Sequence, residues 1–227
     1  MSKVFAFDIY GTLIDAHGLL DKLKPLVGDK AVEFSNLWRE KQLEYSFRRG
    51  LMRDYESFAV CTKQALNYAD LKLDTRLGEQ QRSELLSLYA TLPAFSDVGK
   101  TLVDLKALDI RPYAFSNGTK DAVSGLLKHA NLLPMMDGVV SVDDLNTFKP
   151  NPDVYHHLLR EVGCEPNEVW LISTNTFDII GAQAIGLRTV WLKRDPNAVF
   201  DPWGVEPTLV ISGLSELVAL AKNSALF

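Results

Sequence analysis

The chain has 227 residues, 47% of them hydrophobic and 23% charged, which suits a globular protein with one large domain or a core domain carrying a smaller insertion. Its formal net charge of -5, without any run of five or six basic residues, argues against a nucleic-acid or anionic-membrane surface. An anionic substrate would therefore need a local basic pocket.

The sequence contains no clear signal peptide, membrane span, disulfide framework or zinc-binding pattern. The N-terminal "MSKVFAFD" has one early lysine, but Asp8 interrupts the apolar run before it reaches signal-peptide length, and no apolar stretch of eighteen residues follows. Cys61 and Cys164 lie far apart and lack metal-ligand spacing, so neither a disulfide framework nor a zinc site is expected. We predict a cytoplasmic protein that binds neither membrane nor nucleic acid.

The first predicted element is a short buried strand. Four apolar residues, "VFAF", lead into Asp8, so the strand should deliver one carboxylate to its carboxyl end. The following region, residues 16–95, has helical periodicity and little strand pattern, with one helix expected to end near Gly50. Two apolar helical faces are predicted in it, one with Phe58, Cys61, Ala65 and Tyr68 and one with Leu85, Leu88, Tyr89 and Leu92.

From residue 97 onward, helix and strand patterns alternate. Helices are predicted over residues 97–108, 120–130, 152–163 and 176–186, and strands over 110–116, 138–142, 168–173 and 188–193. Alternation of this kind predicts a parallel sheet covered on both faces. We therefore predict an α/β fold: a doubly wound, Rossmann-like core domain (1–15 and 96–227) with an inserted all-helical cap domain (16–95).

Polar residues follow four of the predicted strands. They are Asp8; Ser116 and Asn117; Lys149; and Ser173, Asn175 and Asp178. Taken singly, the groups other than Asp8 have simple structural explanations: Ser116 and Asn117 could cap a helix, Lys149 could be a solvated loop cation, and Asp178 could be an acid in the first turn of a helix. Because the carboxyl ends of parallel strands meet at one edge of a sheet, their recurrence at four strand ends instead predicts one site facing the cap.

Four segments resemble the motifs of the haloacid dehalogenase superfamily. "FDIYGTLID", "SNG", "KPNPDVY" and "STNTFDIIGA" occur in the family's order, from Asp8 to Gly181. The magnesium-dependent phosphatases of that superfamily carry a second aspartate two residues after the nucleophile and usually a Gly-Asp pair in the last motif. This chain has Tyr10 and "IS" there, and its cap segment "LWREKQLEY" resembles that of the L-2-haloacid dehalogenases.

The resemblance implies chemistry without a metal or other cofactor. Ser173 stands where the phosphatases have a metal-binding carboxylate, and Lys149 supplies positive charge nearby. A halide leaves carbon as an anion and needs no proton donor, so Tyr10 can replace the general acid of the phosphatases. A lone strand-end carboxylate can then act as a nucleophile.

The implied reaction has two steps. Asp8 attacks Cα of a small 2-haloalkanoate opposite the halogen and forms an ester with inversion, converting an L-2-haloacid into a D-2-hydroxy acid once water attacks the ester carbonyl. Asp178 is the implied base. Ser116 and Lys149 are implied to bind the substrate carboxylate, and the residues that orient the carboxylates and water are Thr12, Tyr155, Ser173 and Asn175.

The cap supplies the implied halide site. Arg39 matches the family's halide-binding arginine, with Asn117 and Phe177 lining the cradle; without the motif around it, Arg39 would be expected to face water. The residues expected around the Cα substituent, which could equally belong to the core, are Tyr10, Leu43, Phe58 and Phe177. The family often has Gln in place of Glu40 and Trp in place of Phe177, so pocket size and halide preference stay open.

Two alternatives stay open from the sequence. A magnesium-dependent phosphatase on the same fold would keep Asp8 but would lack its general acid and one metal ligand. A non-catalytic binding module could use the same fold, although such a module would be expected to lose the nucleophile or Lys149. The resemblance also implies a homodimer.

Overall fold

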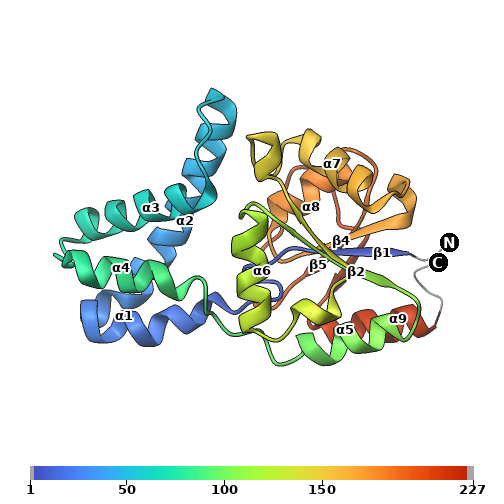
Figure 1. Ribbon diagram of the computed structural model, residues 1–227, viewed down its shortest axis with the longest axis horizontal. Helices are drawn as coiled ribbons and strands as arrows, with labels where there is room; N and C mark the ends of the chain where they lie inside the picture. The colour runs from blue at the N-terminus through green and yellow to red at the C-terminus, as the bar shows by residue number, and fades with distance from the viewer. Residues whose placement is uncertain (1–2, 224–227) are drawn as a thin grey trace.

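The computed structural model describes residues 3–223, so the first two and last four residues of the predicted core domain lie outside the described residues. Six parallel strands form one sheet in the order β3-β2-β1-β4-β5-β6 (Figure 1). The strands are β1 (Val4–Phe7), β2 (Arg111–Ser116), β3 (Gly138–Ser141), β4 (Val169–Ser173), β5 (Arg188–Leu192) and β6 (Leu209–Ile211). The α/β fold with a parallel sheet is confirmed.

Helices cover both faces of this sheet. They are α5 (Val98–Lys106), α6 (Lys120–His129), α7 (Pro152–Val162), α8 (Thr176–Gln183) and α9 (Leu214–Lys222). On β1, Phe5 and Phe7 pack in the cluster that contains residues of α5, α6 and α9, whereas Val4 and Ala6 pack in the cluster of α7 and α8. A continuous apolar run is what a strand buried on both faces requires.

The register of β1 places the site. Phe7, its last residue, pairs with Ala114 of β2 on one side and with Ile172 of β4 on the other. Asp8 is therefore the first residue beyond the strand, at the same edge as the ends of β2 and β4. This edge is the usual ligand-binding edge of an open parallel sheet.

A separate group of helices follows β1 and lies beside this edge (Figure 1). Its members are α1 (Leu20–Val27), α2 (Ala31–Met52), α3 (Phe58–Leu73) and α4 (Glu79–Leu88). Helices α2 and α3 pack through Phe34 and Trp38 on one and Ala65 and Leu66 on the other, all fully buried. Short 3-10 helices span Ala16–Leu19, Gly28–Lys30, Leu133–Met135, Asp143–Leu145 and Pro166–Glu168.

Three local expectations differ from the structure. Helix α2 continues past Gly50 to Met52, and a Cβ on Gly50 would meet Thr147 Oγ1 at 3.4 Å, an ordinary van der Waals distance. Helix α4 ends at Leu88, which leaves Leu92 outside it although it is buried. Neither β6 nor α9 is predicted from the sequence; β6, a three-residue edge strand, is too short for a periodic signal.

Candidate active site

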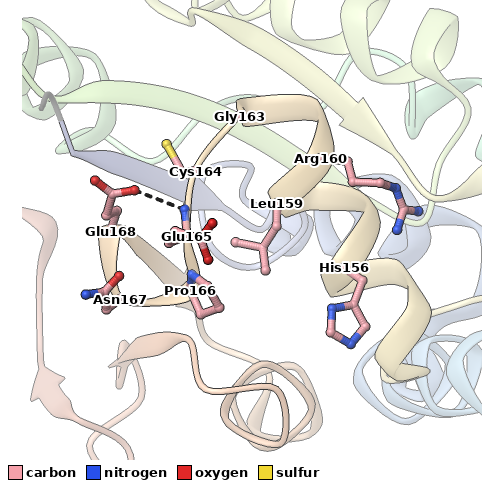
Figure 2. Close-up of a pocket in the computed structure, with 9 residues that line it drawn as sticks. All are labelled: His156, Leu159, Arg160, Gly163, Cys164, Glu165, Pro166, Asn167 and Glu168. Carbon is pink, nitrogen blue, oxygen red and sulfur yellow. Dashed lines mark hydrogen bonds between the residues drawn. The ribbon is translucent and has the colours of Figure 1, made fainter.

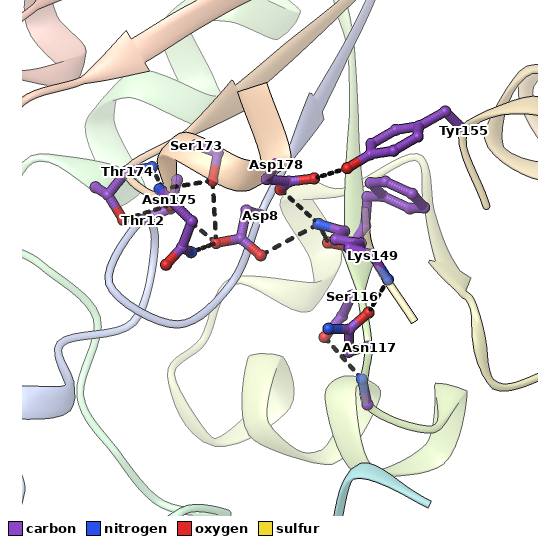
Figure 3. Close-up of polar contacts among 12 residues, drawn as sticks. Asp8, Thr12, Ser116, Asn117, Lys149, Tyr155, Ser173, Thr174, Asn175 and Asp178 are labelled. Atoms are coloured by element: carbon purple, nitrogen blue, oxygen red, sulfur yellow. Dashed lines mark hydrogen bonds and ion pairs between the residues drawn. The ribbon is translucent and has the colours of Figure 1, made fainter. Parts of the chain in front are cut away.

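Side chains from four strand ends meet at the carboxyl edge of the sheet, as the sequence predicts (Figure 3). Lys149 lies at the centre of the group. Its Nζ donates to Asp8 Oδ1 at 3.2 Å, to Asp178 Oδ2 at 2.8 Å and to the carbonyl oxygen of Phe115 at 2.9 Å. The Lys149 side chain is only 2% exposed, so the interpretation of it as a solvated loop cation is wrong. A buried ammonium group is tolerated only with such partners.

The second oxygen of Asp8 is also surrounded by donors. Its Oδ2 accepts from Asn175 Nδ2 at 2.7 Å and from the hydroxyl groups of Thr12 and Ser173, each at 3.3 Å. Thr12 is itself fixed, because its Oγ1 accepts the backbone N–H of Thr174 at 3.0 Å. Four donors thus hold the Asp8 carboxylate in one orientation, while its side chain stays 13% exposed.

Asp178 lies in the first turn of α8, but it does not face solvent. It is fully buried, and its Oδ1 accepts the Tyr155 hydroxyl at 2.8 Å while Oδ2 accepts Lys149. Burial raises the pKa of the Asp178 carboxyl above its ordinary value; the charge of Lys149 opposes this, and the charge of Asp8 adds to it. Burial, and then the charge of Asp178, raise the pKa of Tyr155 well above 10, so its hydroxyl keeps the proton that it donates.

Ser116 and Asn117 are both buried at the end of β2. Ser116 Oγ accepts the N–H of Gly118 at 3.1 Å, and Asn117 Oδ1 accepts the N–H of Lys149 at 3.0 Å. Neither caps α6, because its N-cap is Thr119, whose hydroxyl accepts the N–H of Ala122. The helix-cap explanation for these two residues is therefore wrong.

Arg39 turns from α2 of the cap towards the core. Its Nη1 donates to Gln42 Oε1 at 2.6 Å, and its Nη2 lies 3.5 Å from Asn175 Oδ1. Since Asn175 also donates to Asp8, one side chain connects the cap arginine with the strand-end carboxylate. Arg39 is thus half-buried and directed towards the core, in contrast to the alternative expectation that it faces water.

Two cavities lie between cap and core, and Tyr10 lines both. One, of about 430 Å³, is also lined by Phe58, Thr62, Tyr89 and Gly118. The other, of about 290 Å³, is lined by Arg39, Thr174 and Asn175 together with apolar side chains of the cap. Burial raises the pKa of Tyr10 to about 12, so this phenol stays neutral.

The remaining predicted wall residues lie at the contact between α2 and the core. The ring of Phe177 packs edge-on against Phe47 with centroids 5.1 Å apart, and Leu43 is half-buried on α2. Glu40, one of the two departures from the family pattern, is exposed on the same helix. Phe177 therefore contacts α2 of the cap, whereas the Glu40 side chain is exposed to solvent.

A third depression is remote from these side chains. It has a volume of about 890 Å³ and lies at the end of α7, before β4, at the opposite edge of the sheet (Figure 2). Its lining residues are His156, Leu159, Arg160, Gly163, Cys164, Glu165, Pro166, Asn167 and Glu168. None of the predicted site residues lines it.

The donor set around Asp8 does not fit a magnesium ion. Mg²⁺ requires oxygen acceptors in octahedral geometry. Both oxygens of Asp8 instead face donors, and the hydroxyl of Ser173 donates to Asp8 where a second metal-binding carboxylate would be needed. Positive charge at this point comes from Lys149.

Two parts of the site were not predicted from the sequence. Gln42 accepts a hydrogen bond from Arg39, and the only feature of the sequence that could indicate this contact is their i, i+3 spacing on one helix. Thr174 fixes Thr12 through its N–H, and its carbonyl accepts the indole N–H of Trp191 on β5 at 3.1 Å. Hydrogen bonds made by backbone groups cannot be predicted from the residue types in the sequence.

Comparison with known proteins identifies the family. The model of the haloacid dehalogenase-like hydrolases matches residues 2–186. Because this match spans most of the chain, the protein belongs to that family, as its motifs predict.

Its relatives place it more narrowly, among the (S)-2-haloacid dehalogenases. It is 37% identical over 227 residues to (S)-2-haloacid dehalogenase 4A of Burkholderia cepacia. The aligned region covers 97% of this chain and 96% of that protein. It is 33% identical over 223 residues to the (S)-2-haloacid dehalogenase of Pseudomonas sp. (strain YL), with 98% and 96% covered. The L-2-haloacid dehalogenase of Xanthobacter autotrophicus, solved with chloropropionic acid covalently bound, superposes with a TM-score of 0.91 at 28% identity, covering 98% of this chain and 99% of that one.

Proposed function

We propose that this protein hydrolyses short L-2-haloalkanoic acids to D-2-hydroxyalkanoic acids through an ester on Asp8. The observation that carries the proposal is the setting of Asp8: four donors fix its carboxylate, Lys149 lies beside it, and Arg39 faces the same space from the cap. The names of the relatives and the covalent complex of the Xanthobacter enzyme support the same reaction.

In the first step, the Asp8 carboxylate attacks Cα of the substrate from the side opposite the halogen. The new C–O bond forms as the carbon–halogen bond breaks, and the bonding electron pair leaves with the halide. Arg39, Asn117 and Phe177 receive the halide, and the Arg39 charge stabilises it as it develops. Ser116 holds the substrate carboxylate and the positive charge of Lys149 attracts it, while Tyr10, Leu43 and Phe58 surround the Cα substituent.

In the second step, water attacks the carbonyl carbon of the Asp8 ester. Asp178 takes a proton from that water, and the bond between the carbonyl carbon and the substrate oxygen breaks. Protonated Asp178 gives the proton to the departing oxygen, which releases the 2-hydroxy acid, and the Asp8 carboxyl group loses its proton to solvent and is again a carboxylate. A raised pKa suits Asp178 to this task, because a base works best with a pKa near the working pH. Thr12, Tyr155, Ser173 and Asn175 orient the two carboxylates and the water.

Halide release from a panel of L- and D-2-haloacids tests this function. The L-isomers of 2-chloro- and 2-bromopropionate should release halide in stoichiometric amounts, and the D-isomers should not. The phosphatase alternative is tested in parallel with p-nitrophenyl phosphate, with and without Mg²⁺. Phosphate release without halide release would contradict the proposal.

Removal of metal ions should leave the activity intact. The positive charge next to Asp8 comes from Lys149, so halide release should continue at the same rate after exhaustive treatment with EDTA. The measurement is the rate before treatment, after treatment and after addition of Mg²⁺. A loss that Mg²⁺ restores would contradict the role of Lys149.

Tyr155→Phe should move the acid limb of the kcat–pH profile to higher pH. The Tyr155 hydroxyl lowers the pKa of Asp178 by its hydrogen bond, so its loss raises that pKa further, and the base is then ionised only at higher pH. Tyr113→Phe, a half-buried tyrosine on β2, is the control. An acid limb that does not move would show that Asp178 is not the titrating base.

The domain boundaries and the oligomeric state belong to the same proposal. We assign residues 16–95 to the cap domain and residues 1–15 and 96–227 to the core domain. We further propose a homodimer, supported by the exposed Leu51, Met52 and Leu71, which are 86%, 69% and 82% exposed on α2 and α3 of the cap. Within residues 3–223, no helix is long and apolar enough to cross a membrane, and the cytoplasmic location stays a prediction.

A further inference from the structure

Gln42 is a fully buried polar side chain between Arg39 and helix α3. Its Oε1 accepts Arg39 Nη1 at 2.6 Å, and its Nε2 donates to Thr62 Oγ1 at 2.6 Å. A buried amide is costly unless both ends are paired. Both ends of Gln42 are paired here, and one of them holds the cap arginine.

Thr62 decides which end of the amide faces Arg39. Its hydroxyl donates to the carbonyl oxygen of Phe58, one turn earlier on α3, at 2.8 Å. A hydroxyl has one hydrogen, so Thr62 Oγ1 can only accept from Gln42. The NH₂ end of Gln42 must then face Thr62, which leaves the oxygen end for the guanidinium group.

The partner of Arg39 is neutral. Among the ion pairs of residues 3–223, none joins Arg39 to a carboxylate, and its other nitrogen faces the amide oxygen of Asn175. A carboxylate in place of Gln42 would hold the guanidinium equally well but would offset its charge. A neutral acceptor therefore orients the arginine and leaves its charge available for an anion.

We propose that Gln42 and Thr62 are positioning residues that hold Arg39 towards the departing halide with its charge uncompensated. The inference rests on the proposed function, because it assigns the two residues to the halide side of that reaction. Its consequence is selective: chloride is a poorer leaving group than bromide, so the chloride reaction should depend more on a correctly placed Arg39.

Thr62→Val tests this role. Valine has the shape of threonine without the hydroxyl, so Gln42 loses the partner that fixes its orientation. For L-2-chloropropionate, kcat should fall by roughly ten- to a hundredfold, the scale of one lost hydrogen bond to a charged group. The loss should be smaller for L-2-bromopropionate, KM should change little, and inhibition by added bromide should weaken. Thr62→Ser keeps the hydroxyl and should restore both kcat values.

Two further variants complete the experiment. Thr101→Val, at a buried threonine on α5, controls for the general cost of the substitution and should keep wild-type kinetics. Gln42→Glu keeps an oxygen towards Arg39 but adds a negative charge, so it should weaken bromide inhibition and lower kcat. If Thr62→Val does not fold, Gln42→Glu tests the positioning role in its place.

The outcomes separate this inference from the proposed function. Wild-type enzyme that releases no halide from any 2-haloacid would overturn both. Wild-type enzyme that releases halide, with Thr62→Val or Gln42→Glu at unchanged kcat and bromide inhibition, would overturn the positioning role alone. An equal loss for the chloro and bromo substrates, or a loss that Thr62→Ser shares, would also overturn it.

Discussion

Asp8→Asn is expected to lower the rate of halide release by roughly four to six orders of magnitude, the scale on which removal of a nucleophile acts. The amide keeps the size of the carboxylate, but it has no negative charge and its nitrogen is a poor nucleophile. It would also place an NH₂ group against one of the donors that now surround Asp8. The measurement is halide release over many hours at saturating L-2-haloacid.

Asp153→Asn is the control, because the Asp153 side chain is exposed, in the first turn of α7, whereas Asp8 is held among buried donors. It should keep wild-type activity. If Asp8→Asn retained activity within tenfold of wild type, Asp8 would have no nucleophilic role and the two-step reaction would be wrong.

Arg39→Ala is expected to lower both kcat and kcat/KM by roughly two to four orders of magnitude. The Arg39 charge faces the site and has no carboxylate partner among the ion pairs of the described residues, so it can stabilise a halide that gains charge in the transition state. A contribution confined to substrate binding would raise KM and leave kcat unchanged. Steady-state kinetics with L-2-chloropropionate distinguishes stabilisation of the transition state from a contribution to substrate binding alone.

Arg48→Ala supplies the control on the same helix. Arg48 is exposed and forms an ion pair with Glu44, so its loss should cost little. Arg39→Ala with kinetics close to wild type would reduce Arg39 to a structural link between α2 and Asn175.

Much of the site could be predicted because its residues follow strands. A parallel sheet brings its carboxyl ends to one edge, so Asp8, Ser116 and Ser173 could be assigned to one place without knowledge of the side-chain packing. The buried position of Lys149 between Asp8 and Asp178 agrees with the positive charge that was expected there.

What the sequence did not predict depends on packing between segments. The chain of hydrogen bonds from Phe58 through Thr62 and Gln42 to Arg39 exists only because α2 and α3 lie side by side, and helical periodicity does not specify which faces meet. Gly50 illustrates a related limit: it resembles a helix end in the sequence, but α2 continues through it to Met52.

The source of the product oxygen tests the central claim most directly. In a single turnover with excess enzyme in H₂¹⁸O, water attacks the carbonyl carbon of the Asp8 ester and never the substrate carbon. The first D-2-hydroxy acid should therefore be unlabelled, and the heavy oxygen should be found in the Asp8 carboxylate by mass spectrometry of the peptide. A product that carries the label in the first turnover, with unlabelled Asp8, would mean direct attack by water and would contradict the ester on Asp8.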